Sequence, residues 1–351
     1  MKASDTRSVG VIGAGSFGTA VANLLAQNCD VLLYSRKEEK VAHINEHHQN
    51  AGVVLADRIR ATNDVEEIAA RCTLVFPIVP SASFRQMMRT FGPHLKPYHI
   101  VIHGTKGFDL LPPFREEELD VPGMLLSRAH VRTMSEVILE ESSAVRVGCI
   151  AGPNLAREIL DGKPSAAVVA SRFREVIQAG QAVLSCHKFR VFGTYDLLGA
   201  ELAGAFKNII ALGSGILDGY GLGRNIQGLL IARGLAEMVN LGKALGASSQ
   251  AFIGVAGIGD LVTTATSPDS RNYQFGIRLA QGENVEQIRS TLVEPAEGVR
   301  TLRVARQLVR QYRLHSPIIE VLHTVVFERF PIDRAIEYLM SYPYSVDVDF
   351  L

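Results

Sequence analysis

The sequence predicts an α/β fold, with an N-terminal doubly wound parallel sheet of the Rossmann type followed by an all-helical C-terminal domain. Short apolar runs alternate with helical patterns through the first half of the chain, and the first run ends in a glycine-rich turn that opens a helix. After about Tyr195 the strand patterns give way to helical periods rich in small residues. A chain of 351 residues is long enough for two domains, which we place at residues 1–194 and 195–351.

The strands of the sheet are expected in short runs that are apolar throughout, as is typical of strands buried on both faces. Two further runs, Ala166–Ala170 and Phe189–Phe192, are expected at the edge of the sheet. The six main runs are Val9–Ile12, Val31–Tyr34, Ile59–Thr62, Leu74–Val79, Ile100–His103 and Val145–Ile150.

Helices are expected between these strands. The first runs from the glycine turn through Gln27, and a polar helix covers Glu38–His47. The segment Asp64-Val-Glu-Glu67 offers a capping box for the next helix. The stretch Asp109–His130 shows no clear period, and we interpret it as a long surface loop or insertion. Because it follows Lys106 closely, a lid is the alternative interpretation.

The charge balance bears on the partners of the chain. Lys and Arg together number 36, as do Asp and Glu, so the formal net charge is zero. A neutral chain argues against nucleic acid or an anionic membrane as the main partner, although a local basic pocket remains compatible with it. No signal peptide or membrane anchor is visible in the sequence. We therefore expect a cytoplasmic location.

The cysteine and histidine pattern gives no indication of a metal site. The four cysteines are scattered and form no Cys-x-x-Cys pair, which favours free thiols in a reducing compartment. They are Cys29, Cys72, Cys149 and Cys186. A small cluster of His43, His47 and His48 lacks a cysteine or carboxylate partner at metal-ligand spacing. We expect no metal.

The glycine turn after the first strand has the spacing Gly13-x-Gly15-x-x-Gly18. Gly13 suits a tight turn, Gly15 lets the backbone approach a pyrophosphate, and Gly18 lets the helix pack closely on the sheet. The start of the helix then offers N–H groups to the anion. The turn therefore predicts a dinucleotide-binding domain.

The end of the second strand bears on the choice of dinucleotide. An NAD-specific domain usually carries an acidic residue there to bind the ribose hydroxyls. This chain has Tyr34-Ser35-Arg36-Lys37 instead. Arg36 and Lys37 could hold the 2′-phosphate of NADP, or they could be a solvated basic pair. We favour NADP, and NAD remains open.

A predicted helix in the second half carries Lys207 on a face of small residues. Gly204, Ala203 and Ala200 precede it on this face, and Ala211 and Ser214 follow it. Small neighbours let a ligand come close to the lysine amine. The alternative is tight packing between helices, with an incidental lysine.

Two further clusters are candidates for the site. Glycines precede Asp260 at an expected helix start, where the carboxylate either caps the helix or orients a lysine or a substrate hydroxyl. In Ser270-Arg271-Asn272, a guanidinium between two hydrogen-bonding side chains suits a phosphate, although such a triplet is weak evidence alone.

Taken together, these motifs resemble the NAD(P)-dependent glycerol-3-phosphate dehydrogenases of the bacterial type. The resemblance runs through most of the chain, with the motifs in the same order. They are Gly13-Ala-Gly-Ser-Phe-Gly-Thr-Ala20, Val79-Pro-Ser81, Thr105-Lys-Gly107, Ala151-Gly-Pro153, Glu201–Asn208, Arg233–Met238, Gly257–Leu261, Ser270–Asn272 and Ala296–Gly298.

The resemblance implies roles for individual residues. Lys207 looks like the proton donor and acceptor, with Asp260 as the second catalytic residue. Asn154 stands where the family pattern usually has Ser or Thr. The implied substrate contacts are Lys106, Gly152, Asn154, Lys207, Asp260, Ser270, Arg271 and Asn272. The implied cofactor contacts are Gly13, Gly15, Ser16, Phe17, Gly18, Arg36, Lys37, Lys106, Ala156, Arg271 and Glu297.

The resemblance also implies the reaction, which interconverts sn-glycerol 3-phosphate and dihydroxyacetone phosphate with NAD(P)(H) and supplies glycerol 3-phosphate for phospholipid synthesis. A free lysine amine has a pKa of about 10.4, so Lys207 would enter carbonyl reduction as a charged proton donor. The alternatives are a hydroxy-acid dehydrogenase of the same build and a cofactor-binding sensor without turnover. A sensor would be expected to lack Lys207 or Asp260, and both are present. A homodimer is left open.

Overall fold

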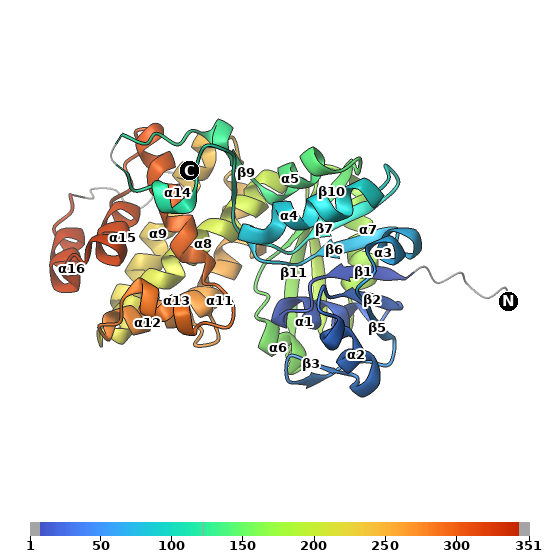
Figure 1. Ribbon diagram of the computed structural model, residues 1–351. Coiled ribbons are helices and arrows are strands. Elements are labelled where there is room, and N and C mark those ends of the chain that lie inside the picture. The colour runs from blue at the N-terminus through green and yellow to red at the C-terminus, as the bar shows by residue number, and fades with distance from the viewer. Residues whose placement is uncertain (1–7, 122, 344–351) are drawn as a thin grey trace. The chain divides into compact units, whose positions relative to one another are not determined.

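The computed structural model describes residues 8–121 and 123–343, and the chain divides into two compact units (Figure 1). The first, the sheet unit, contains the residues up to Asp109 together with Thr133–Leu197. The second, the helical unit, contains Leu110–Arg132 together with the residues from Leu198 onward. The segment 110–132 therefore belongs to a different unit from the residues on either side of it.

The sheet unit is built on eight strands, which include all the runs that the sequence indicated. They are β1 (Val9–Ile12), β2 (Val31–Tyr34), β5 (Ile59–Thr62), β6 (Leu74–Pro77), β7 (Ile100–His103), β10 (Arg146–Ala151), β11 (Ser165–Ser171) and β12 (Phe189–Thr194). Their order is β12–β11–β10–β7–β6–β1–β2–β5. The six neighbouring strands β10–β7–β6–β1–β2–β5 have the doubly wound order, and the winding reverses between β1 and β6. Ligands of such sheets bind at the carboxyl ends of the strands beside this point.

One pairing differs from the predicted parallel sheet. Strand β11 runs antiparallel to β10, whereas β12 is again parallel to β11. The connection between β10 and β11 contains only the short helix α6 (Ala156–Leu160). Five residues of helix are about 7.5 Å long, which is too short for a crossover over the sheet. The chain therefore returns in the opposite direction.

The connecting segments of the sheet unit form further helices and one hairpin. The helices are α1 (Ser16–Leu25), α2 (Glu38–His47), α3 (Val65–Arg71), α4 (Ser81–Phe91), the 3-10 turn η1 (Gly92–His94), α5 (Met134–Glu141) and α7 (Arg174–Leu184). Asp64 caps α3, accepting from the backbone N–H groups of Glu66 and Glu67, but the reciprocal bond to the Glu67 side chain that completes a capping box is not formed. The backbone N–H of Asp64 donates to Thr62 Oγ1. The hairpin of β3 (Gln49–Asn50) and β4 (Val53–Val54) was not predicted.

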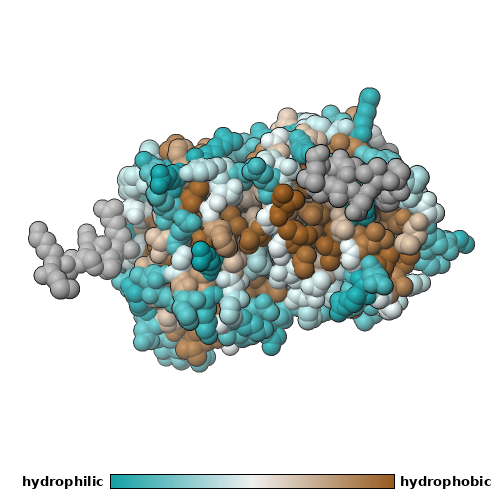
Figure 2. All heavy atoms as spheres, turned by 180° about the vertical axis from the view of Figure 1, so that it is seen from behind, coloured by the Kyte–Doolittle hydropathy of each residue, from teal (hydrophilic) through white to brown (hydrophobic). Residues whose placement is uncertain are grey.

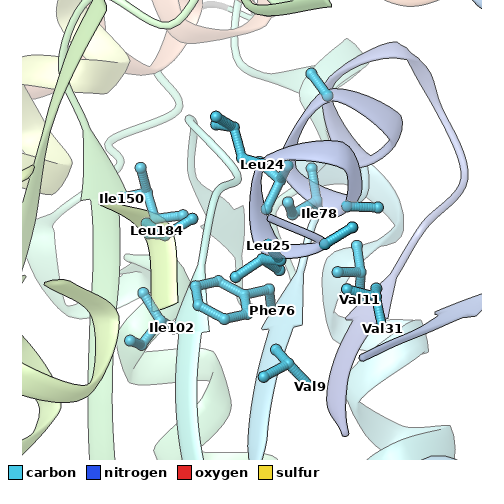
Figure 3. Packing of buried hydrophobic residues seen from close by; sticks show 14 of the residues in the cluster. Val9, Val11, Leu24, Leu25, Val31, Phe76, Ile78, Ile102, Ile150 and Leu184 are labelled. Atoms are coloured by element: carbon cyan, nitrogen blue, oxygen red, sulfur yellow. The ribbon is translucent and has the colours of Figure 1, made fainter. Parts of the chain in front are cut away.

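Two apolar layers cover the faces of the sheet. Successive strand residues point to opposite faces, so Val11 and Leu33 belong to one layer while Ile12 and Leu32 belong to the other. Helices α1 and α7 close the first layer, where Leu25 and its neighbours pack over β1 and β6 (Figure 3). Helices α3, α4 and α5 close the second. These layers fix the carboxyl ends of the strands and the turns that follow them.

The helical unit contains a second set of helices. They are α8 (Leu197–Gly219), α9 (Arg224–Ala244), α10 (Gln250–Ile253), the π-helical turn η4 (Val255–Gly259), α11 (Asp260–Thr266), α12 (Arg271–Ala280), α13 (Val285–Thr291), α14 (Glu297–Gln311), α15 (Pro317–Glu328) and α16 (Ile332–Met340). Helix α8 has the length and apolar composition of a membrane span, but 94% of its apolar window is buried inside the protein. It is the central core helix of this unit.

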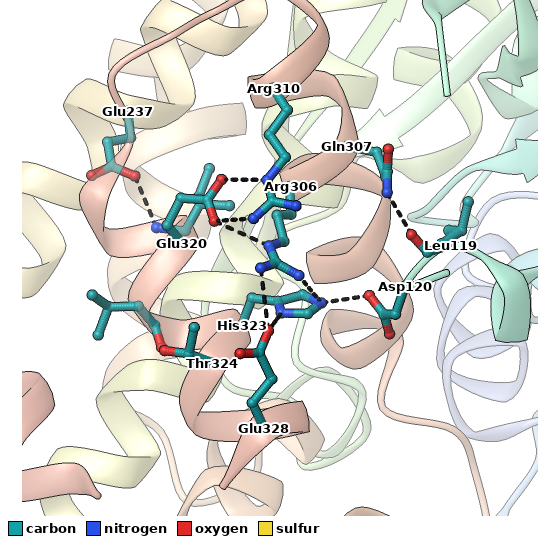
Figure 4. A network of polar contacts seen from close by, with 12 residues as sticks. Leu119, Asp120, Glu237, Arg306, Gln307, Arg310, Glu320, His323, Thr324 and Glu328 are labelled. Atoms are coloured by element: carbon teal, nitrogen blue, oxygen red, sulfur yellow. Dashed lines mark hydrogen bonds and ion pairs between the residues drawn. The ribbon is translucent and has the colours of Figure 1, made fainter. Parts of the chain in front are cut away.

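Residues 110–132, here called the strap, do not form a free surface loop. They contain β8 (Asp109–Leu110, shared with the sheet unit), the 3-10 turns η2 (Glu116–Glu118) and η3 (Arg128–His130), and β9 (Val131–Arg132). Leu119 is fully buried, and its carbonyl accepts a hydrogen bond of 2.5 Å from Gln307 Nε2 (Figure 4). Asp120 lies 2.8 Å from Arg303 Nε and 2.6 Å from His323 Nε2. The strap is thus anchored to α14 and α15. The prediction of a surface loop is wrong for the part around Leu119 and Asp120, which packs against these helices.

Hydrophobic residues also reach the surface. Figure 2 shows them gathered in patches among hydrophilic residues on one face of the molecule. Within the helical unit, an apolar hollow of about 90 Å³ opens among α8, α9, α15 and α16. Leu217, Leu229, Val325 and Ile336 are among the residues that line it.

Candidate active site

The glycine turn at the end of β1 is closely packed. Gly13 has φ +118°, and a Cβ built on it would lie 2.1 Å from the carbonyl oxygen of Ile78. A Cβ on Gly18 would lie 1.8 Å from the carbonyl oxygen of Gly13. Neither position has room for a side chain. Gly15 is exposed at the start of α1, and no side chain caps this helix. The residues present fit an anion at this helix start.

Arg36 and Lys37 follow β2 directly, and both are exposed. Arg36 lies close enough to the Tyr34 ring to act on its phenol. Burial raises the pKa of that phenol, and the positive charge of Arg36 partly opposes the rise. This exposed placement is compatible both with binding of the 2′-phosphate of NADP and with a solvated basic pair.

Lys106 lies on the turn after β7, where the sequence placed it. Its Nζ is 3.4 Å from the carbonyl oxygen of Gly152, on the turn after β10. Thr105 Oγ1 donates to the carbonyl of Val79 at 2.6 Å, which ties the turn after β6 to the same region. Three successive turns at the carboxyl edge of the sheet are therefore linked.

Asn154 lies on the turn that contains Gly152. Its Nδ2 donates to the carbonyl of Ala151 at 3.2 Å. Its Oδ1 is buried and accepts no hydrogen bond from the described residues. A buried acceptor without a donor is unfavourable, so this oxygen is suited to a ligand hydroxyl or amide. Ala156 follows as the first residue of α6.

In the helical unit the structure brings Lys207 and Asp260 together. Lys207 Nζ lies 2.5 Å from Asp260 Oδ1 and 2.6 Å from Thr264 Oγ1. Thr264 Oγ1 in turn donates to the backbone carbonyl of Asp260 at 2.6 Å. At most 5% of each of these three residues is exposed. The ammonium is thus held by a carboxylate and a hydroxyl, and the carboxylate orients the lysine rather than capping α11.

Thr264 is a site residue that sequence reasoning missed. It lies one turn after Asp260 on α11, and residues four apart share a face of a helix. The spacing was visible in the sequence, but nothing there showed which face of α11 meets Lys207.

The small-residue face around Lys207 packs in part against another helix. Ser214 Oγ donates to the carbonyl of Ala265 on α11 at 2.6 Å, and Ala203 and Ala211 are fully buried. The alternative of tight helix packing is therefore correct for the Ser214 end of this face. The same packing places Asp260 and Thr264 beside the lysine.

The Ser270–Asn272 triplet forms the start of α12. Ser270 Oγ accepts from the backbone N–H of Tyr273 and caps the helix. Arg271 is half-exposed, with its Nη1 2.7 Å from Glu294 Oε2. A guanidinium at a helix N-terminus provides two favourable features for an anion.

Asn272 is turned inward. Its Nδ2 donates to Asn208 Oδ1 at 3.0 Å, and its Oδ1 accepts from the backbone N–H of Gly298 at 2.8 Å. These bonds connect α12 with α8 and with the first turn of α14, where Glu297 is the first residue. Asn272 therefore positions the elements that carry Lys207 and Arg271.

A buried acid also lies in the helical unit. Glu237 on α9 accepts hydrogen bonds from the backbone N–H groups of Ile318 (2.7 Å) and Ile319 (3.0 Å) at the start of α15. Burial raises its pKa to about 8, against the opposing effect of these donors and of Arg233. Glu237 thus fastens α15 to α9 from the interior.

Within residues 8–121 and 123–343, no three His, Cys, Asp or Glu side chains lie together as metal ligands would. Cys29, Cys72 and Cys149 are buried, and Cys186 is partly buried. Burial raises the thiol pKa of Cys29 to about 11 and that of Cys72 to about 12. These two thiols are poor nucleophiles.

Comparison with known proteins covers both units. Residues 8–177 match the family described as NAD-dependent glycerol-3-phosphate dehydrogenase N-terminus, and residues 196–337 match its C-terminus. A glycerol-3-phosphate dehydrogenase [NAD(P)+] from Saccharophagus degradans is 37% identical over 99% of this chain and 93% of its own length. One from Streptomyces griseus is 38% identical over 94% of this chain and 95% of its own length.

Solved structures show the same similarity. The crystal structure of glycerol-3-phosphate dehydrogenase from Coxiella burnetii has a TM-score of 0.85 and 28% identity, covering 96% of this chain and all of that one. A ketopantoate reductase from Ralstonia eutropha has a TM-score of 0.58 and 16% identity, covering 94% and 99% of the two chains. The second likeness shows the fold alone.

Proposed function

We infer the function from the family, because the chain belongs to the NAD-dependent glycerol-3-phosphate dehydrogenases. It interconverts sn-glycerol 3-phosphate and dihydroxyacetone phosphate, using NAD(P)(H) as the hydride carrier. The product of the reducing direction is a precursor for phospholipid synthesis. The observation that carries the chemical assignment is the buried contact of Lys207 with Asp260 and Thr264.

Lys207 is assigned the proton transfer. In the reducing direction its ammonium donates a proton to the carbonyl oxygen of dihydroxyacetone phosphate, and in the oxidising direction its amine takes the proton back. Asp260 favours the charged form by its negative charge, and Thr264 fixes the position of Nζ. When bound, the nicotinamide supplies or accepts the hydride.

The glycine turn and the basic pair are assigned to the dinucleotide. Gly13, Gly15, Ser16, Phe17 and Gly18 would surround its diphosphate. Arg36 and Lys37, exposed after β2 where no acidic residue stands, would bind a 2′-phosphate, so NADPH is the favoured carrier. Lys106, Ala156, Arg271 and Glu297 complete the proposed cofactor contacts.

Substrate contacts are assigned in each unit. In the sheet unit they are Lys106, Gly152 and Asn154, supported by the unfilled acceptor of Asn154. In the helical unit they are Lys207, Asp260, Ser270, Arg271 and Asn272. Among these, Arg271 is the best suited to a phosphate because its guanidinium is half-exposed at the start of α12.

The organisation of the chain is proposed on the same grounds. Residues 1–194 would bind the dinucleotide, and residues 195–351 would supply substrate binding and catalysis, with the strap as part of the second unit. We assign the enzyme to the cytoplasm, without nucleic-acid or stable membrane partners. We also propose a homodimer, for which the apolar hollow beside α16 offers surface to bury, and light scattering after size-exclusion chromatography tests it.

The deciding experiment follows NADPH and NADH oxidation with dihydroxyacetone phosphate, on wild type, Lys207→Ala and the exposed-lysine control Lys243→Ala. We expect turnover in wild type and in the control, and a fall in kcat of about 10²–10⁴-fold in Lys207→Ala. ADP-ribose binding should be unchanged in all three proteins. Wild type that binds ADP-ribose but does not reduce dihydroxyacetone phosphate would contradict the assigned reaction.

A further inference from the structure

The glycine turn is held from behind by two side chains outside the glycine motif. The carbonyl oxygen of Ala14 accepts hydrogen bonds from Lys40 Nζ at 2.5 Å and from Asn50 Nδ2 at 3.1 Å. Asn50 Nδ2 also donates to Thr19 Oγ1 at 2.7 Å, and Thr19 Oγ1 donates to the carbonyl of Gly15 at 2.7 Å. Two successive carbonyls of the turn, those of Ala14 and Gly15, therefore accept hydrogen bonds from side chains.

The hairpin of β3 and β4 brings Asn50 to this position. The chain leaves α2 through His48, which has φ +48°, and the hairpin turn has φ +50° at Ala51 and +76° at Gly52. Two positive φ values are typical of the tight I′ turn. The left-handed conformation is unfavourable for alanine, because it brings Cβ close to a carbonyl oxygen. Asn50 itself is 7% exposed. The fold thus tolerates some strain to bury one asparagine against the glycine turn.

The hydrogen bonds to the carbonyls of Ala14 and Gly15 also determine which way the neighbouring N–H groups point. In a trans peptide, the carbonyl of one residue and the N–H of the next point in opposite directions. Holding the carbonyls of Ala14 and Gly15 on the side of Asn50 and Thr19 directs the N–H groups of Gly15 and Ser16 away from that side. N–H groups bind a diphosphate, whereas carbonyl oxygens repel it.

We propose that Asn50, assisted by Lys40, is a positioning residue that presents the amides of the glycine turn to the diphosphate of the dinucleotide. Asn50 acts through the Ala14–Gly15 peptide rather than by touching the cofactor. This inference rests on the proposed function, because it needs the glycine turn to bind a dinucleotide.

The test compares Asn50→Ala with a matched asparagine in the same unit. Asn45 also exchanges two hydrogen bonds with backbone, donating to the carbonyl of Ala61 at 3.0 Å and accepting from its N–H at 2.8 Å. It lies on α2 and contacts β5 instead of the glycine turn. Calorimetry measures Kd for NADPH, for ADP-ribose and for adenosine 2′-monophosphate, which lacks the diphosphate.

We expect Asn50→Ala to raise Kd for NADPH and ADP-ribose about tenfold, as the loss of about one well-placed hydrogen bond would. Its Kd for adenosine 2′-monophosphate, and its kcat at saturating NADPH, should stay within about twofold of wild type, which is an effect of about 0.4 kcal/mol. Asn45→Ala should leave all three dissociation constants unchanged, even where both variants lower Tm.

Two variants of Thr19 test the same network independently. Thr19→Ser keeps the hydroxyl that accepts from Asn50 and should bind ADP-ribose as wild type does, whereas Thr19→Val removes it and should weaken binding. Unchanged ADP-ribose binding in Asn50→Ala or Thr19→Val would overturn the inference, as would a parallel loss of adenosine 2′-monophosphate binding in Asn50→Ala. Wild type that binds no ADP-ribose would instead contradict the proposed function.

Discussion

Lys207 Nζ and Asp260 Oδ1 lie 2.5 Å apart, on α8 and α11, and both side chains are almost fully buried. Removing one partner of such a pair leaves an uncompensated charge away from water, which is costly. The pair therefore constrains Lys207 in two ways: it fixes the position of the amine, and it favours the protonated form.

Asp260→Asn should separate these two effects. Asparagine keeps the shape of the side chain but no longer stabilises the ammonium. We expect kcat for dihydroxyacetone phosphate reduction to fall by about 10²-fold or more. Steady-state measurement of kcat checks this, and a kcat within about twofold of wild type would contradict the proposed role of Asp260.

Thr264 should contribute through its hydroxyl. Thr264→Val removes the oxygen that lies 2.6 Å from Lys207 Nζ, whereas Thr264→Ser retains it. We expect kcat to fall by about tenfold in the valine variant, equivalent to one net hydrogen bond, and by about twofold or less in the serine variant. The two variants should have similar KM for NADPH. A fall in kcat as large in the serine variant as in the valine variant would contradict this role of the hydroxyl, and a larger fall in the serine variant would point to packing of the methyl group, which valine retains.

Glu237 should make stability depend on pH. Burial raises its folded-state pKa to about 8, above the value of about 4.3 for an unfolded glutamate. The folded protein therefore holds a proton that the unfolded chain releases. This contribution to stability is fully present below about pH 4.3 and is lost as the pH rises through about 8.

Glu237→Gln tests this dependence. Glutamine has one carbonyl oxygen for the two backbone donors of α15, so we expect a lower free energy of unfolding throughout. Its loss of stability between pH 5 and 8 should nevertheless be smaller than in wild type, because the titrating group is gone. Urea unfolding at several pH values measures both effects. Glu286→Gln, at an exposed position on α13, should match wild type, and an equally steep pH dependence in Glu237→Gln would refute the assignment.

Asp120 should hold the strap. Burial and Arg306 keep the pKa of His323 below its usual range, so the neutral imidazole donates from Nε2 to Asp120. Asp120→Ala removes this bond and the contact with Arg303, and we expect the free energy of unfolding to fall by about 1–3 kcal/mol. Trypsin should then cleave the strap faster, while Glu117→Ala, which alters an exposed residue of the same segment, should have little effect. Equal cleavage in both variants would mean that Asp120 does not anchor the strap.

Local patterns predicted much of the fold. The strands and the glycine turn are short-range features, since each depends on apolar runs or glycine spacing that the chain displays directly. The β3–β4 hairpin was missed because Gln49–Asn50 and Val53–Val54 are too short to show a period. The antiparallel course of β11 depends on how far α6 can carry the chain, and that was not visible in the strand patterns.

Contacts between distant segments account for the rest of the site. The strap is fastened by Gln307 and His323, which lie about two hundred residues further along the chain. Asn272 was expected to contact substrate, but its amide bonds to Asn208 and Gly298 were not visible in the triplet itself. Composition indicates the chemistry that a side chain can perform, whereas its partners depend on which helix faces meet.

The packing of α8 against α12 gives the last prediction. A Cβ on Gly215 would lie 1.9 Å from the carbonyl oxygen of Tyr273, and a Cβ on Gly276 would lie 2.1 Å from that of Leu212. The two helices therefore meet backbone to backbone, and neither can accept a methyl group without separating. We expect Gly215→Ala to lose about 3 kcal/mol or more of unfolding free energy. Since α8 also carries Lys207, kcat should fall as well.

Gly228 on α9 is the matched control, because it is exposed and a Cβ there would meet nothing within 4 Å. The same substitution should stabilise the protein by about 0.5–1 kcal/mol, since alanine restricts the unfolded chain and favours helix. Urea midpoints of the two variants should thus move in opposite directions from wild type. A Gly215→Ala protein as stable as Gly228→Ala would show that α8 and α12 can separate at little cost. The position of Lys207 would then have to depend on its contacts with α11.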